Sequence, residues 1–121
     1  MRPDDLFDRA AAGLQRRLPA VTPADLDAPT PCAGWNVRDL LAHLAEESCW
    51  AAGVLVGDAP EVVTARCDGD LIADQPVAAL DRLTAAARTV ARDPSRDTVS
   101  FGERTMATGD YLTELFADYL V

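Results

Sequence analysis

Apolar residues recur every three to four positions in four stretches of the chain, a spacing typical of amphipathic helices. These stretches cover residues 3–18, 36–56, 76–92 and 109–121. Residues that favour helix ends flank them, namely Pro3, Asn36, Gly57, Pro76 and Thr108. The last stretch reaches the end of the sequence in mid-pattern. Three full amphipathic helices and part of a fourth predict an all-α protein built as a helical bundle.

Two segments between these stretches lack the helical period. Residues 58–74 are polar and contain Pro60 and Gly69, which predicts a long loop that includes a turn of helix. In residues 97–108, the apolar Val99 and Phe101 alternate with polar residues before a Gly-Glu pair. This alternation predicts a short β-hairpin that leads into the last helix.

Charge and composition narrow the class of protein. The 121 residues suit one domain, and the formal net charge is −9 with no lysine in the chain. Such a chain repels phosphate backbones and anionic lipid, so we expect no nucleic-acid partner and no membrane partner. No apolar run approaches the length that spans a bilayer, and the first residues do not resemble a signal peptide.

The cysteines point to the compartment. Cys32, Cys49 and Cys67 are odd in number and form no Cys-x-x-Cys pair. This usage predicts free structural thiols in a reduced, cytoplasmic protein.

His43 is the chain's one histidine and lies in the second helical stretch. At 100° per residue it falls about 120° from the centre of the apolar stripe, so it is a boundary residue. Glu47 follows one helical turn later on the same side. Two interpretations remain open: a half-exposed histidine paired with Glu47 or water, and a metal ligand or base that projects between helices.

Asp118 poses the same question in the last helical stretch, where it flanks the apolar face. It is either a solvated acid or a carboxylate that faces into the bundle and binds a cation. Two such donors fall short of the three or four that zinc sites use. Trp35, in the loop before the second helix, is read as a loop anchor, with the lining of a substrate pocket as the alternative.

The stretch "TPCAGWNVRDLLAHL", residues 30–44, adds a family resemblance. It resembles the signature of the DinB-like metalloenzymes, in the branch of the N-terminal domain of mycothiol-dependent maleylpyruvate isomerase. There, a Thr-Pro-Cys-x-Gly-Trp loop leads into a helix that reads Val-Arg-Asp-Leu-x-x-His-Leu. The stretches "DQPVAALDRLTAAA" and "FGERTMATGDYLTELFADYLV" are similar to the family's third helix and the start of its fourth. The resemblance covers nearly the whole chain.

The resemblance implies a DinB-like four-helix bundle, here with an incomplete fourth helix, and a divalent metal at one end. His43 stands at the position of the first metal ligand. Asp118 stands at the acid of an acid-x-x-x-His pattern, and the paired histidine would follow Val121. Zinc or nickel is the expected metal. The implied chemistry uses a low-molecular-weight thiol, mycothiol in this branch, which adds as a thiolate to a small electrophilic substrate in an isomerisation or an S-transfer.

The shortened metal site changes what we expect of this chain. With only His43 and Asp118 present, the resemblance implies a truncated domain that is inactive or poor in metal, and no residue is assigned a catalytic role. The alternative is a non-catalytic helical bundle that acts through self-association or partner binding. Because the bundle's open face would remain uncovered, we expect a homodimer.

Overall fold

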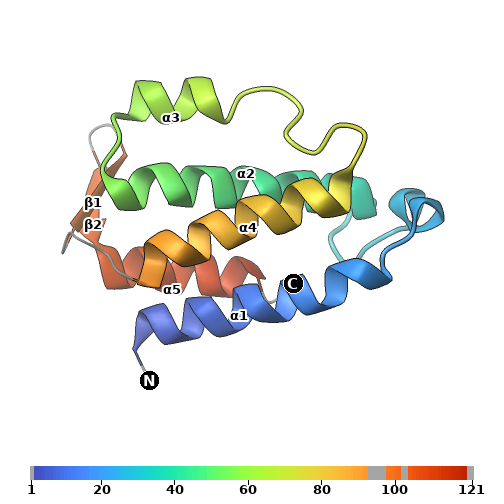
Figure 1. Ribbon diagram of the computed structural model, residues 1–121, viewed down its shortest axis with the longest axis horizontal. Coiled ribbons are helices and arrows are strands. Elements are labelled where there is room, and N and C mark those ends of the chain that lie inside the picture. The colour runs from blue at the N-terminus through green and yellow to red at the C-terminus, as the bar shows by residue number, and fades with distance from the viewer. Residues whose placement is uncertain (1, 93–97, 102–103, 120–121) are drawn as a thin grey trace.

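The computed structural model describes residues 2–92, 98–101 and 104–119, and the side chains of residues 100, 101, 104 and 115–119 lie outside that description. Within the described residues the chain forms helices and one short hairpin (Figure 1). The elements are α1 (Pro3–Arg17), α2 (Val37–Val56), α3 (Pro60–Arg66), α4 (Pro76–Arg92), β1 (Thr98–Phe101), β2 (Arg104–Ala107) and α5 (Thr108–Tyr119). Two short 3₁₀ turns, Leu18–Ala20 and Pro23–Asp27, follow α1.

The four longer helices form a bundle, so the expected all-α architecture is confirmed. Helix α2 packs along α4, and α1 packs along both α5 and α4. Helix α3 lies on the outside of α2, away from α1 and α5 (Figure 1). The β1–β2 hairpin lies at one end of the bundle (Figure 1). Helix α2 begins at the opposite end, where the segment that connects α1 to α2 is also found.

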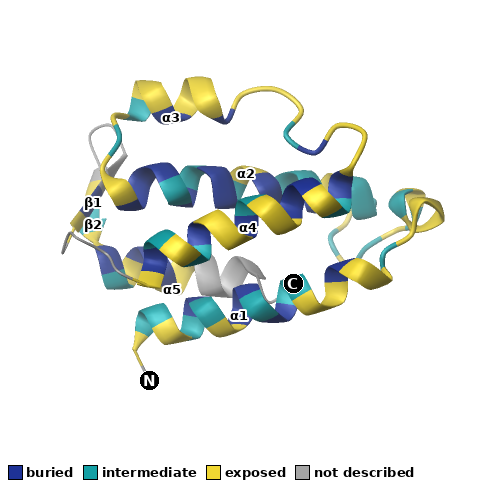
Figure 2. Ribbon diagram, in the orientation of Figure 1, coloured by how far each residue is buried: buried dark blue, intermediate teal, exposed yellow. Residues whose placement is uncertain are grey.

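The core lies between the four longer helices, where each helix turns its buried face inward (Figure 2). Its largest fully buried apolar side chains come from all four longer helices and from the segment before α4, namely Phe7, Leu55, Ile72, Leu80 and Leu112. Burial of these faces is the main driving force for the fold. The outer face of α3 is mostly exposed, since this helix covers α2 only on one side.

The helix boundaries follow the local signals in the sequence. Asn36 caps α2, and Gly57 ends it in the left-handed conformation at φ 84°, which glycine adopts without steric cost. Helix α4 spans the predicted residues, α1 ends one residue early, and α5 begins one residue early at Thr108. The predicted hairpin is also present, with Val99 opposite Met106, although its turn at residues 102–103 lies outside the described residues.

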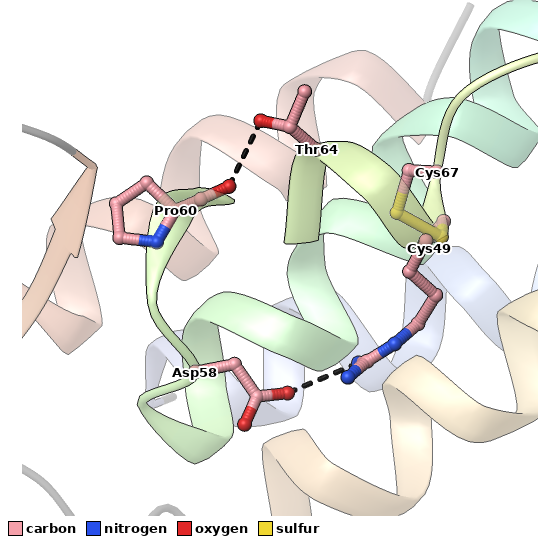
Figure 3. Close-up of a disulfide and its surroundings, with 6 residues drawn as sticks. Cys49, Asp58, Pro60, Thr64 and Cys67 are labelled. Carbon is pink, nitrogen blue, oxygen red and sulfur yellow. Dashed lines mark hydrogen bonds and ion pairs between the residues drawn. A yellow bond between two sulfur atoms is a disulfide. The ribbon is translucent and has the colours of Figure 1, made fainter. Parts of the chain in front are cut away.

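Two expectations need correction, and both concern the segment after α2. The predicted long loop contains a seven-residue helix, α3, which begins at Pro60 and buries Val63 against α2. The expectation of three free thiols is wrong, because Cys49 of α2 and Cys67 at the end of α3 form a disulfide (Figure 3). Their Cα atoms lie 5.9 Å apart, a proximity that arises only once α3 packs on α2. Cys32 is a free thiol.

The disulfide removes the cysteine-based argument for a reduced compartment, so the cytoplasmic location stays a prediction. Among the described residues, no helix combines the length and apolar character that crossing a bilayer requires.

Candidate functional site

A tightly bonded loop sets the start of α2. The Asn36 side chain accepts a hydrogen bond from the Asp39 backbone N–H at 2.9 Å, and Asp39 Oδ2 accepts one from the Asn36 N–H at 3.1 Å. This reciprocal capping box satisfies backbone donors that the helix itself leaves unpaired. Just before it, the Thr30 hydroxyl bonds the Trp35 carbonyl at 2.9 Å, and Gly34 turns the chain at φ 83°. The loop therefore fixes both Trp35 and the direction of α2.

His43 lies on α2 beside that loop. Its ring centroid is 5.0 Å from that of Trp35, with the two planes tilted by 51°. Its Nε2 lies 3.6 Å from Glu47 Oε1, which suits an ion pair better than a hydrogen bond. The side chain of His43 is 37% exposed, so its predicted boundary position is confirmed. The imidazole thus lies between the Trp35 ring and the Glu47 carboxylate and remains partly exposed to solvent.

His43 borders a surface cavity of about 700 Å³. One wall comes from the loop and α2, through Trp35, Asp39, His43 and Glu46. The other wall comes from the end of α3 and the segment after it, including Cys67 and Asp70. Trp35 is thus both a loop residue and part of the cavity wall, and its alternative interpretation as a pocket-lining residue fits the structure.

The walls of this cavity are rich in carboxylates. Asp39 uses one oxygen in the capping box, and Asp70 Oδ1 accepts the backbone N–H of Ala73 at 3.0 Å. Glu46 is exposed. Three acidic side chains thus border the cavity, and no arginine is among its lining residues, so its walls favour negative potential. Such a cavity attracts cations and disfavours anions that are not paired with a cation.

The donors present do not by themselves complete a metal centre. Among the residues that the structure describes, no group of three or more His, Cys, Asp or Glu side chains is placed to hold a metal ion. His43 and Glu47 provide two adjacent donors, fewer than a typical zinc site uses. Asp118 belongs to α5, but its side chain lies outside the described residues. The predicted pairing of His43 with Asp118 therefore stays a prediction.

The sequence analysis predicted His43 but not the acidic wall residues. Asp39 and Glu46 lie one turn before and one turn after His43 on the same helix face, a spacing that could have identified them. Cys67 and Asp70 carried no such signal, because only the folding of residues 60–75 over α2 brings them to the cavity. Cys32 lies apart from His43 and borders a neighbouring cavity of about 330 Å³, together with Trp35 and Asp39.

No curated protein and no solved structure matches the chain at a significant level. One family model does match, and it covers residues 7–121, which include the loop, all of α2 and the residues that line the cavity. The chain belongs to the family of the mycothiol maleylpyruvate isomerase N-terminal domain.

Proposed function

We propose that this chain is a divalent-metal-binding domain of a low-molecular-weight-thiol-dependent isomerase or S-transferase, with the His43 cavity as its site. One observation carries the proposal. His43, at the ligand position that the family resemblance implies, lies half-exposed in the wall of a large cavity and not in the core. A buried core histidine would have supported only a structural role.

The residues around the cavity have separable roles in this proposal. Glu47 and Trp35 orient the imidazole, through the carboxylate 3.6 Å from Nε2 and the ring contact at 5.0 Å. His43 and Asp118 are the proposed ligands of zinc or nickel. A bound divalent cation lowers the pKa of a thiol and so supplies a thiolate at neutral pH. The acidic walls favour the entry of that cation.

Such a thiolate would be a nucleophile toward a small substrate with an activated double bond. Its sulfur would bond to one carbon while the π bond opens, and the displaced electron pair would take up a proton. Reversal of this addition after rotation would give an isomerase, and retention of the carbon–sulfur bond would give an S-transferase. The described residues bind and orient in this scheme, and none of them is assigned a proton-transfer step.

The test is metal binding to the purified chain, measured by isothermal titration calorimetry with zinc and with nickel. We expect His43→Ala to weaken the affinity about tenfold or more, and Asp118→Asn to weaken it as well. Glu61→Gln is the matched control, because Glu61 is an exposed acid on α3 outside the cavity wall and should leave the affinity unchanged. Equal affinities of the unaltered chain and His43→Ala would contradict the proposal.

One observation favours the alternative, a non-catalytic module that acts through association. The large apolar side chains of Val56, at the end of α2, and Val62, in α3, are exposed to solvent. Failure to bind zinc or nickel under saturating supply, together with a stable dimer, would support this alternative over the enzyme.

A further inference from the structure

The disulfide lies beside the candidate site, although the proposed thiol chemistry does not use it. Cys49 sits within α2, and Cys67 follows the last residue of α3. Both cysteines are buried, with Cys49 6% and Cys67 7% exposed. Cys67 lines the same cavity as His43, whereas Cys49 does not line it. A molecule held in the cavity therefore lies against Cys67 and not against Cys49.

We propose that Cys67 is a site of covalent exchange with a low-molecular-weight thiol that enters the His43 cavity. The thiolate sulfur attacks Cys67 Sγ, a new sulfur–sulfur bond forms, and the Cys67–Cys49 bond breaks. Cys49 leaves with the electron pair and takes a proton from water. The incoming sulfur is oxidised and Cys49 is reduced, so the step requires no further oxidant. A second thiol can release the adduct as a free disulfide and leave both cysteines reduced.

Access determines which sulfur is attacked when both lie in one disulfide. Cys49 packs with Val63 in a small apolar cluster beneath α3, to which Trp50, Leu71 and Leu83 contribute. Cys67 shares this cluster but also reaches the cavity wall. Access from the cavity thus favours an adduct on Cys67 and a free thiol on Cys49.

Helix α3 has a second attachment to α2 besides the disulfide. Val63 is fully buried and packs closely on Gly53 of α2. Arg66 forms an ion pair at 3.0 Å with Asp58, which lies in the loop between α2 and α3. The ion pair is partly exposed and contributes little, whereas the Val63 contact is apolar and dry. Opening the disulfide should therefore leave α3 docked on α2, and the buried Ile72 should keep the segment after Cys67 in place. The exchange would change the cavity without unfolding the bundle.

The test uses the full chain with its disulfide intact and its Cys32 thiol already blocked. The chain is treated with EDTA and incubated with mycothiol, or separately with glutathione. The reaction is quenched with acid, free thiols are alkylated, and the adducts are mapped by peptide mass spectrometry. We expect the mixed disulfide on Cys67 and the alkyl group on Cys49, with a preference of about tenfold or more. A majority of adduct on Cys49, or no exchange before denaturation, would overturn the proposal.

A pair of variants provides a second test in which loss of the disulfide is matched. Cys49→Ser and Cys67→Ser, each in a Cys32→Ser background, are treated with the oxidised form of the same thiol. We expect the chain that keeps Cys67 to take up the thiol about tenfold faster than the chain that keeps Cys49. Equal rates in two folded variants would overturn the proposal. If both variants unfold, the adduct map of the unaltered chain decides.

This exchange goes beyond the proposed metal-dependent function, since it needs neither cation nor electrophilic substrate. EDTA in the assay separates the two. A chain that fails to bind zinc but forms the Cys67 adduct supports the exchange alone. A chain that binds zinc through His43 and forms no adduct supports the metal site alone.

Discussion

At the scale of single residues, Asp8 shows how one side chain can join two helices. Arg88 of α4 donates to it twice, from Nε to Oδ1 at 2.8 Å and from Nη2 to Oδ2 at 3.2 Å. Arg88 also donates to Gln15 on α1 at 2.6 Å. The hydrogen bonds from Arg88, ahead of its charge and that of Arg92, hold the pKa of Asp8 below its usual 3.8, although partial burial opposes them. Asp8 is therefore ionised and paired at neutral pH.

The lowered pKa of Asp8 predicts a pH dependence of stability. A carboxyl group whose folded pKa lies below its unfolded value stabilises the fold above pH 3.8 and loses that contribution as the pH falls further. We expect Asp8→Asn to lower the free energy of unfolding at pH 7 by about 1 kcal/mol, because the pair is partly exposed. The difference from the unaltered chain should shrink below pH 3.8, as urea denaturation at several pH values can show.

Asp68→Asn is the control for this measurement, since Asp68 is an exposed acid in the loop after α3. It should change the free energy of unfolding by less than about 0.5 kcal/mol at either pH. A loss for Asp8→Asn that stays constant from pH 7 to pH 2 would show that the ion pair with Arg88 does not stabilise the fold.

At the scale of elements, the docking of α3 on α2 depends on a close approach. A Cβ atom added at Gly53 would lie 2.6 Å from Val63 Cγ2 and 3.2 Å from Val63 Cγ1. Real side-chain contacts are not that short, so one helix would have to move. Glycine at this position lets α3 lie near enough to α2 for Cys67 to reach Cys49.

Gly53→Ala should therefore destabilise the chain despite the better helix propensity of alanine. We expect a loss of about 1–3 kcal/mol in the free energy of unfolding, as is usual for overpacking. Val63→Ala should also destabilise, but the double variant should lose less than the sum, since the smaller side chain makes room. Thermal or urea denaturation of all four chains completes this cycle.

Gly13→Ala serves as the matched control, because Gly13 is also an interior helix glycine. Its added Cβ would meet only the flexible end of Arg17 at 3.0 Å and that of Arg16 at 3.7 Å. This change should be neutral or stabilising by up to about 1 kcal/mol. Strict additivity of Gly53→Ala and Val63→Ala would mean that the two side chains do not compete for the same space.

Elements differed in how far they could be predicted, and the reason is the range of the interactions that form them. Asn36 and Gly57 mark the ends of α2 through local hydrogen bonds and backbone preferences, so sequence alone locates them. Likewise, the angular position of His43 follows from helical geometry. Helix α3 and the disulfide depend on packing between residues far apart in the chain. For that reason neither the Cys49–Cys67 pairing nor the place of Cys67 in the cavity wall was predictable.

At the scale of the whole molecule, charge and exposed apolar surface act against each other. The formal net charge of −9 makes two copies of the chain repel one another. Val56 and Val62, 46% and 49% exposed, would gain from being covered by a second copy. Self-association should therefore depend on how strongly salt screens the charges.

We predict a homodimer whose stability increases with salt. Light scattering at low and at physiological ionic strength should give a larger dimer fraction at the higher salt, where the Debye length falls to about 8 Å. Val62→Asp should shift the chain toward monomer, while Glu61→Gln beside it should not. A monodisperse monomer across the whole salt range would contradict the prediction.

The link between Cys49 and Cys67 also has a mechanical consequence. It closes a covalent ring that contains the end of α2 and all of α3, with a sequence separation of 18 residues. A force applied to the two ends of the chain passes through the sulfur atoms, so the residues inside the ring bear no tension. Fully extended, that segment would add about 60 Å, which becomes available only when the ring opens. The unfolded chain therefore has two contour lengths, and its redox state selects between them.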